Sequence, residues 1–274
     1  MRVHIISDME GVAGIVRPQQ TLGGHAMYEE GRKLYTEEIN AAVRGAKAAG
    51  AKEIVVMDHH GAGEGWDFNS LVHDMLDPAC EYVVQSSWTH YTEFLEGGCD
   101  ACLLVGMHAM AGTPNGVMNH TVSGRAWFNL RFNGVTVGES AINAAMCGNW
   151  RCPVLLVTGD EAACREAKTL LGEGLTTVAV KKGIGSRAAR NLAPLLAREL
   201  IEEGARNALR DLEAVQPYDP GRPAEIEVDF MNTAEVEKYR GRTGIEVTGP
   251  RSIVARADTW WDAWRNLFLE PSLS

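Results

Sequence analysis

The sequence predicts an α/β fold with a mixed, mostly parallel sheet flanked by helices, and a smaller C-terminal α+β subdomain. Short apolar runs alternate with segments of helical periodicity for most of the length, which is typical of βαβ units. Three prolines at 217, 220 and 223 then interrupt the pattern, and an alternating strand follows them. We therefore expect an α/β core over residues 1–215 and a C-terminal α+β extension of the same unit over residues 216–274.

The first half of the chain begins with an apolar run at residues 3–6 and continues into a long helix. In that helix Leu34, Ile39 and Val43 recur at helical spacing, and Gly50 is a typical C-terminal stop. Three further apolar runs predict buried strands, at residues 53–57, 81–84 and 101–106.

The second half opens with a hairpin signal, because Asn133-Gly134 separates two β-like segments, 125–132 and 135–137. Beyond it we expect helices at 139–149, 160–171, 186–214 and 233–239, and a last one from residue 258. The expected strands lie at 154–158, 176–180, 225–230, 245–248 and 252–257.

Composition and charge narrow the class of protein. With 274 residues, of which 45% are hydrophobic and 23% charged, the chain resembles an ordinary soluble protein with a sizeable core. A net charge of −10 argues against a nucleic-acid partner and fits a bound cation or an amine-bearing substrate. We expect no membrane span and no signal peptide, and the six cysteines form no disulfide-scaffold pattern, so a cytoplasmic location is the default.

The turn after the first strand carries two carboxylates, Asp8 and Glu10. Residues i and i+2 of an extended segment point the same way, so their oxygens are expected to face one spot. Carboxylates that close repel each other unless a proton or a cation lies between them. The alternative is that Asp8 caps the next segment and Glu10 is solvated, since such a pair occurs often by chance.

Other polar candidates also follow apolar strands. His60 and His108 lie just beyond two of them, and Glu139 opens a helix, where the helix dipole favours an anion. Because ligands of open α/β sheets bind beyond the carboxyl ends of the strands, Asp8, Glu10, His60 and His108 are expected to converge. Oxygen and imidazole ligands suit zinc, manganese or cobalt, and five ligands are best explained by two ions that share one carboxylate.

Two more histidines require separate interpretations. His59 should point away from His60 if strand geometry persists, so only one of them is expected to face the metals. His108 and His120 flank a loop with glycine and proline and no core periodicity, which favours a site over packing.

Five ordered motifs carry a family resemblance: Asp8-Met9-Glu10-Gly11, Asp58-x-His60, Gly106-x-His108-Ala109, the segment from Thr113-Pro114 to His120, and Val137-Gly138-Glu139. Together they resemble the D-aminopeptidase family of zinc-dependent M55 peptidases over nearly the whole chain. The resemblance implies a binuclear zinc aminopeptidase in which Asp8 bridges two ions, Glu10, His60, His108 and Glu139 complete the ligands, and His120 is the catalytic residue. It also implies a homodecamer acting on short peptides or amides with an N-terminal D-residue such as D-Ala, through metal-activated water.

Alternative functions stay open at this point. An amidohydrolase acting on a non-peptide amide would have the same metal site. A binuclear phosphohydrolase uses similar ligands, but the sequence has no compact glycine-rich phosphate cradle and no arginine cluster beside the motifs. A non-enzymatic binding protein would need neither metal nor His120.

Overall fold

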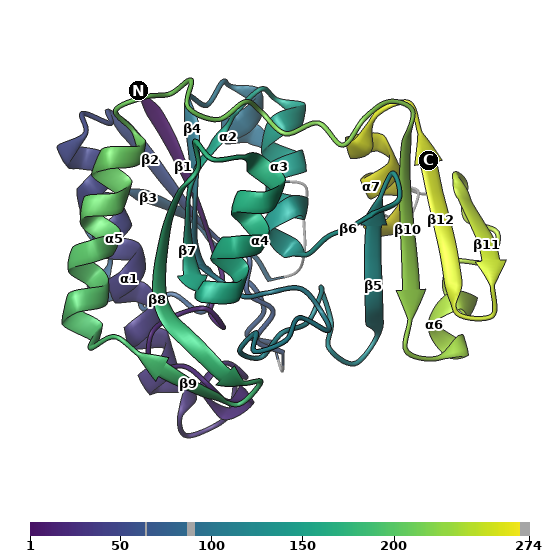
Figure 1. Cartoon of the computed structure of the whole chain (residues 1–274), viewed down its shortest axis with the longest axis horizontal. Helices are drawn as coiled ribbons and strands as arrows, with labels where there is room; N and C mark the ends of the chain where they lie inside the picture. Colours follow the sequence, from purple (N-terminus) through teal and green to yellow (C-terminus); the bar gives the residue numbers. More distant parts are fainter. Residues whose placement is uncertain (64, 87–90, 269–274) are drawn as a thin grey trace.

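The computed structural model describes residues 1–63, 65–86 and 91–268 (Figure 1). Its larger sheet has seven strands in the order β3-β2-β1-β4-β7-β8-β9, all parallel except the pair β8 and β9. The predicted mixed, mostly parallel sheet is therefore confirmed. Its strands are β1 (Arg2–Ser7), β2 (Glu53–Asp58), β3 (Glu81–Val83), β4 (Ala101–Met107), β7 (Val154–Asp160), β8 (Thr176–Gly185) and β9 (Ala188–Asn191).

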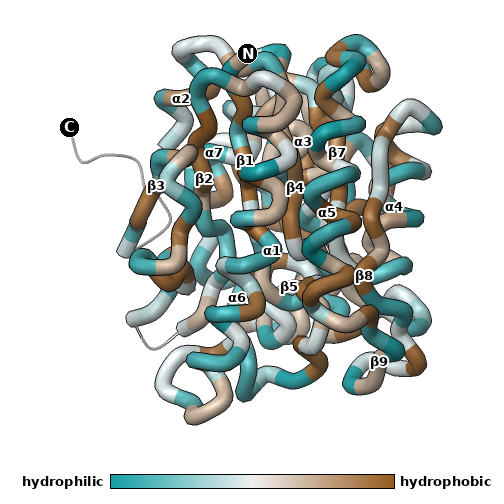
Figure 2. Tube along the Cα trace, turned by 90° about the vertical axis from the view of Figure 1, so that its left-hand side faces the viewer, coloured by the Kyte–Doolittle hydropathy of each residue, from teal (hydrophilic) through white to brown (hydrophobic). Residues whose placement is uncertain are grey.

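Helices cover both faces of this sheet (Figure 1). Helices α1 (Tyr28–Ala48) and α5 (Pro194–Ala208) pack together on one face, and α3 (Glu139–Asn149) and α4 (Glu161–Leu171) lie on the other. The central strands β1, β4 and β7 are almost entirely buried, as expected for a parallel sheet covered on both sides, and Figure 2 shows apolar residues concentrated along them. The carboxyl ends of these strands all lie at one edge of the sheet.

A second, five-stranded antiparallel sheet has the order β11-β12-β10-β5-β6. Its strands are β5 (Trp127–Phe132), β6 (Val135–Thr136), β10 (Ala224–Phe230), β11 (Ile245–Gly249) and β12 (Ser252–Ala257), and the last helix, α7 (Trp260–Phe268), packs against β10 and β12. The expected hairpin turn is present, with positive φ at Asn133 and Gly134.

Because β5 pairs with β10, the hairpin belongs to the sheet that the C-terminal segment builds. The sheet boundary therefore does not coincide with the division at residue 215, and that division stays a prediction.

Short segments complete the fold: η1 (Pro18–Gln20), η2 (His73–Met75), α2 (Glu93–Glu96) and α6 (Thr233–Glu237). Within the described ranges no helix is long and apolar enough to cross a membrane. All six cysteines are free thiols.

One predicted helix is wrong. Residues 186–214 do not form a single helix, because residues 188–191 pair antiparallel with β8 and the helix begins only at Pro194. Proline lacks an N–H and has a fixed φ, so it fits the first turn of a helix far better than its interior. The proline thus marks the start of α5, and the short strand before it was hidden by the charged, weakly patterned sequence.

Candidate metal centre

The loops after β1 and β4 contact each other through their backbones, which brings the first two carboxylates beside His108. The Gly11 N–H donates to the Gly106 carbonyl at 2.7 Å. A Cβ at Gly11 would lie 2.1 Å from the Met107 carbonyl oxygen, and one at Gly106 would lie 2.0 Å from the Asp8 carbonyl oxygen. Only glycine permits an approach this close, so these two glycines fix the distance between the two strand ends.

His60 is placed by a buried carboxylate that sequence analysis did not assign to the site. Asp58 ends β2 and its Oδ1 accepts the His60 N–H at 2.9 Å and the Tyr35 hydroxyl at 2.8 Å. Its Oδ2 accepts the backbone N–H of Ser70. Asp58 therefore fixes the turn that points the His60 ring toward Asp8 and Glu10.

Glu139 enters the site from the first turn of α3, as expected. Its Oε1 accepts the backbone N–H of Val122 at 2.7 Å. Val122 has a φ of 60°, which is rare for a β-branched residue and costs on the order of 1–2 kcal/mol. The surrounding structure keeps Val122 in this strained conformation, and the Val122 N–H thereby provides a fixed hydrogen-bond donor for Glu139.

The five predicted ligands converge in two groups that share Asp8. In the first group, His60 Nδ1 lies 3.2 Å from Asp8 Oδ1 and 3.0 Å from Glu10 Oε2. In the second, His108 Nε2 lies 3.2 Å from Asp8 Oδ2 and 3.3 Å from Glu139 Oε1. Each oxygen of Asp8 thus faces a different histidine.

Backbone carbonyls determine which nitrogen of each histidine carries the proton. His60 Nε2 donates to the Thr21 carbonyl at 2.7 Å, His108 Nδ1 to the Ala109 carbonyl at 2.9 Å, and His120 Nδ1 to the Met118 carbonyl at 2.8 Å. A carbonyl oxygen only accepts, so the other nitrogen of each neutral ring directs a lone pair at carboxylate oxygens. Hydrogen bonds of this kind orient histidines that bind metals.

The contacts between the histidines and the carboxylates shift the pKa values of His60, His108 and Asp8. Burial by itself lowers the pKa of His60 and His108, but the neighbouring carboxylates outweigh it and raise both pKa values well above the usual range. Burial raises the pKa of Asp8, yet contacts with His108 and His60 hold it well below the usual range. A divalent cation bound at these positions would compete with protons for the same nitrogens and oxygens.

The donor atoms fit a metal ion. Asp8 Oδ2, Glu10 Oε2 and His108 Nε2 are buried and make no hydrogen bond to any residue that the structure describes. Buried polar atoms without hydrogen bonds are costly, so an ion that they coordinate would remove the cost. Ligands about 2.0–2.1 Å from a tetrahedral zinc ion are themselves about 3.3 Å apart, which matches the separations within both groups.

His120 lies beside the second group. Its ring stacks on that of His108 with centroids 4.0 Å apart, and its Nε2 is 3.7 Å from Glu139 Oε1. Ligand atoms of His108, His120 and Glu139 all lie within 4.8 Å of one another, so His120 is also a candidate ligand. Its side chain is 23% exposed, whereas that of His108 is 1% exposed, so His120 is the imidazole that substrate can reach.

Two acidic residues from β7 and α4 hold the loop between His108 and His120. Asp160 caps α4 through Ala163 and accepts the Val117 N–H at 2.7 Å. Glu166 accepts the Met110 N–H at 2.9 Å and the Thr113 hydroxyl. These contacts place His120, although nothing in the sequence marks either acid as part of the site.

Lys181 is a second feature that sequence analysis missed. This 3% exposed lysine of β8 donates to the carbonyls of Glu10 at 2.5 Å, Val12 at 2.9 Å and Ile15 at 2.6 Å. Burial lowers the pKa of Lys181 to about 8, so the ammonium is still charged at neutral pH. Lys181 therefore fixes the loop that carries Glu10.

Replacing Lys181 with methionine should lower the free energy of unfolding by about 3 kcal/mol, because buried carbonyls lose their donor. Urea denaturation of the metal-free protein measures the change. The matched control is Lys182→Met on the adjacent position, whose side chain is 56% exposed. Equal stabilities of the two variants would show that the three carbonyls do not depend on Lys181.

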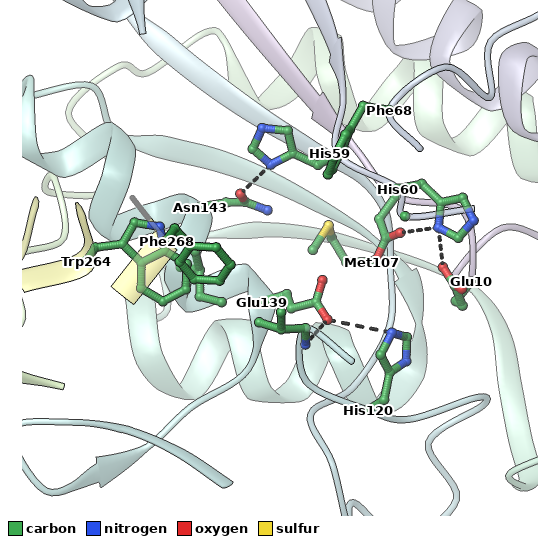
Figure 3. Close-up of a pocket in the computed structure, with 14 residues that line it drawn as sticks. Glu10, His59, His60, Phe68, Met107, His120, Glu139, Asn143, Trp264 and Phe268 are labelled. Carbon is green, nitrogen blue, oxygen red and sulfur yellow. Dashed lines mark hydrogen bonds and ion pairs between the residues drawn. The ribbon is translucent and has the colours of Figure 1, made fainter. Parts of the chain in front are cut away.

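A cavity of about 150 Å³ opens in front of the two groups (Figure 3). Asp8, Glu10, His60, His120 and Glu139 line one side of it. The rest of the lining is mostly apolar and includes three aromatic residues from the β2–β3 loop and from α7, namely Phe68, Trp264 and Phe268. His59 also lines the cavity, and its Nδ1 lies 3.0 Å from Asn143 Oδ1. Of the two adjacent histidines, only His60 lies against Asp8 and Glu10, as expected.

Three comparisons with known proteins agree. A family model described as D-aminopeptidase, Peptidase M55, matches residues 1–269. The chain is 31% identical over 281 residues to a D-aminopeptidase of Bacillus subtilis strain 168, covering 100% of this chain and 98% of the relative.

Among solved structures, the fold matches the Zn-dependent D-aminopeptidase DppA from Bacillus subtilis, described as a self-compartmentalizing protease. The TM-score is 0.89 at 30% identity, and the match covers 97% of this chain and 95% of the other. The chain therefore belongs to the D-aminopeptidase family, peptidase M55, and is a hydrolase of the metallo-aminopeptidase class.

Proposed function

We propose that this protein is a binuclear zinc aminopeptidase that removes the N-terminal residue, preferably a D-residue such as D-Ala, from short peptides or amino-acid amides. Manganese or cobalt can replace zinc in such a ligand set. The observation that carries the proposal is the pair of groups that share Asp8, with His60 in one and His108 in the other. The zinc dependence and the D-aminopeptidase activity of the relative support it.

The roles of the residues follow from their positions. Asp8, Glu10 and His60 would hold one ion, and Asp8, His108 and Glu139 the other. When bound, the ions supply a Lewis acid for the substrate carbonyl and a water molecule of lowered pKa. His120 faces the same cavity and is the proposed catalytic residue, which exchanges a proton with the leaving amine or with the attacking water.

An amidohydrolase acting on a non-peptide amide is the second candidate function. Much of the cavity lining is apolar, including Phe68, Trp264 and Phe268, and these side chains can contact a substrate that is not a peptide. The substrate panel below separates the two functions.

We also propose that the chain forms a homo-oligomer, a decamer by its likeness to the self-compartmentalizing relative, in the cytoplasm. Apolar side chains exposed on α5 support association, because Leu195 is 68% and Leu196 44% exposed. Ile184, near the end of β8, is 70% exposed.

The experiment that tests the proposed function is turnover of matched D- and L-aminoacyl amides, D- and L-dipeptides and non-peptide amides by metal-free and zinc-loaded protein. We expect hydrolysis of aminoacyl substrates by the zinc-loaded form, with D-Ala substrates preferred, and no turnover by the metal-free form. Hydrolysis of only non-peptide amides would favour the second candidate, and hydrolysis by metal-free protein would refute both.

A further inference from the structure

Asn143 is a buried amide on the face of α3 that carries Glu139. It is 4% exposed and lies four residues after Glu139, so both side chains project from the same side of the helix. Its neighbours in the helix are small or apolar residues, among them Ala141, Ile142 and Ala144. A primary amide in such surroundings is costly unless its polar atoms find partners.

His59 fixes the orientation of this amide. His59 Nδ1 lies 3.0 Å from Asn143 Oδ1, and because an amide oxygen only accepts, the ring nitrogen donates. The Asn143 nitrogen then turns toward the interior of the cavity, on the side of Met107 (Figure 3). No hydrogen bond from Asn143 Nδ2 to another described residue is present, and the Asn143 side chain lines the cavity.

Several side chains that accept hydrogen bonds line the cavity that Asn143 faces. The carboxylates of Asp8, Glu10 and Glu139 line the same space, together with the His120 ring. A protonated amine on a substrate only donates hydrogen bonds, so it is not complementary to the Asn143 N–H. A carbonyl oxygen is the part of an aminoacyl group that is complementary to the amide N–H.

We propose that Asn143 is a substrate-binding residue that donates a hydrogen bond from Nδ2 to the carbonyl oxygen of the N-terminal residue of the substrate. His59 is then a positioning residue, which holds the Asn143 amide with its nitrogen toward the substrate. This inference rests on the proposed function, since it assigns a contact to an aminoacyl substrate.

The first test is Asn143→Asp, which keeps the size of the side chain and removes the donor. We expect kcat/KM to fall about a hundredfold, the scale seen when one preorganised donor is lost, with zinc content unchanged. The matched control is Asn149→Asp at the end of the same helix, outside the cavity lining, which should keep wild-type kinetics. Wild-type kcat/KM in Asn143→Asp would overturn the inference.

A pair of inhibitors separates substrate binding from a structural role. An α-aminoketone offers a carbonyl oxygen, and the alkylamine of the same length does not. Asn143→Leu, which removes the donor and adds no charge, should weaken the aminoketone about tenfold, roughly the value of one hydrogen bond, and leave the alkylamine unchanged. Equal weakening of both inhibitors, or of neither, would contradict the contact.

The positioning role of His59 is tested by His59→Leu and His59→Gln. The leucine variant should lose affinity for the aminoketone, and the glutamine variant, which retains an N–H donor, should recover part of it. Identical losses in the two variants would refute this role. Calorimetry measures the binding of both inhibitors without any turnover of substrate. If the wild type proved inactive, the proposed function would be refuted, but the inhibitor affinities would still test the Asn143 contact.

Discussion

Replacing His120 with alanine should lower turnover about a hundredfold or more while the metal content stays near that of the wild type. This is the scale of general acid–base catalysis. The physical reason is position: His120 is the most exposed of the three histidines around the carboxylates, and its Nε2 is 3.7 Å from the nearest carboxylate oxygen. Measuring kcat with D-alaninamide and metal content on the same sample tests both halves of the prediction.

The control for His120→Ala is His25→Ala, which removes an exposed histidine outside the cavity lining. Unchanged turnover in His120→Ala would end the catalytic assignment. A loss of one ion per subunit would instead make His120 a ligand, as its distance to Glu139 also permits.

Replacing Asp8 with alanine should abolish activity and leave fewer than one ion per subunit. Asp8 faces His60 with one oxygen and His108 with the other, so its loss removes a ligand from both groups at once. Glu10 and Glu139 each contribute to one group only, and each of their alanine variants should keep part of the metal. Elemental analysis after extensive dialysis measures the ratio of metal to protein.

The matched control for Asp8→Ala is Asp74→Ala, an exposed aspartate of η2. Circular dichroism of both variants shows whether the fold persists. Full metal occupancy in a folded Asp8→Ala protein would contradict the bridging assignment.

The convergence of the site was predictable from the sequence because the geometry of parallel sheets is general. Asp8, His60 and His108 each follow a strand, and neighbouring parallel strands end at the same edge, so pattern and topology suffice. Glu139 was predictable from its place at the start of a helix. The alternation of apolar runs and helical segments likewise predicted most strands and helices.

The residues that support the site were not predictable, because their partners are distant in sequence and mostly backbone. Lys181 donates to carbonyls about 170 positions earlier, and Asp160 accepts an N–H from Val117. A single lysine or aspartate next to an apolar strand carries no sign of such contacts. The position of the hairpin in the second sheet was hidden for the same reason, since only the pairing of β5 with β10 reveals it.

The most direct test of the paired metal site is diffraction from zinc-loaded crystals at wavelengths above and below the zinc absorption edge. Two anomalous peaks per subunit are expected, one among Asp8, Glu10 and His60 and one among Asp8, His108 and Glu139. A single peak, or peaks away from Asp8, would contradict a binuclear centre bridged by that carboxylate.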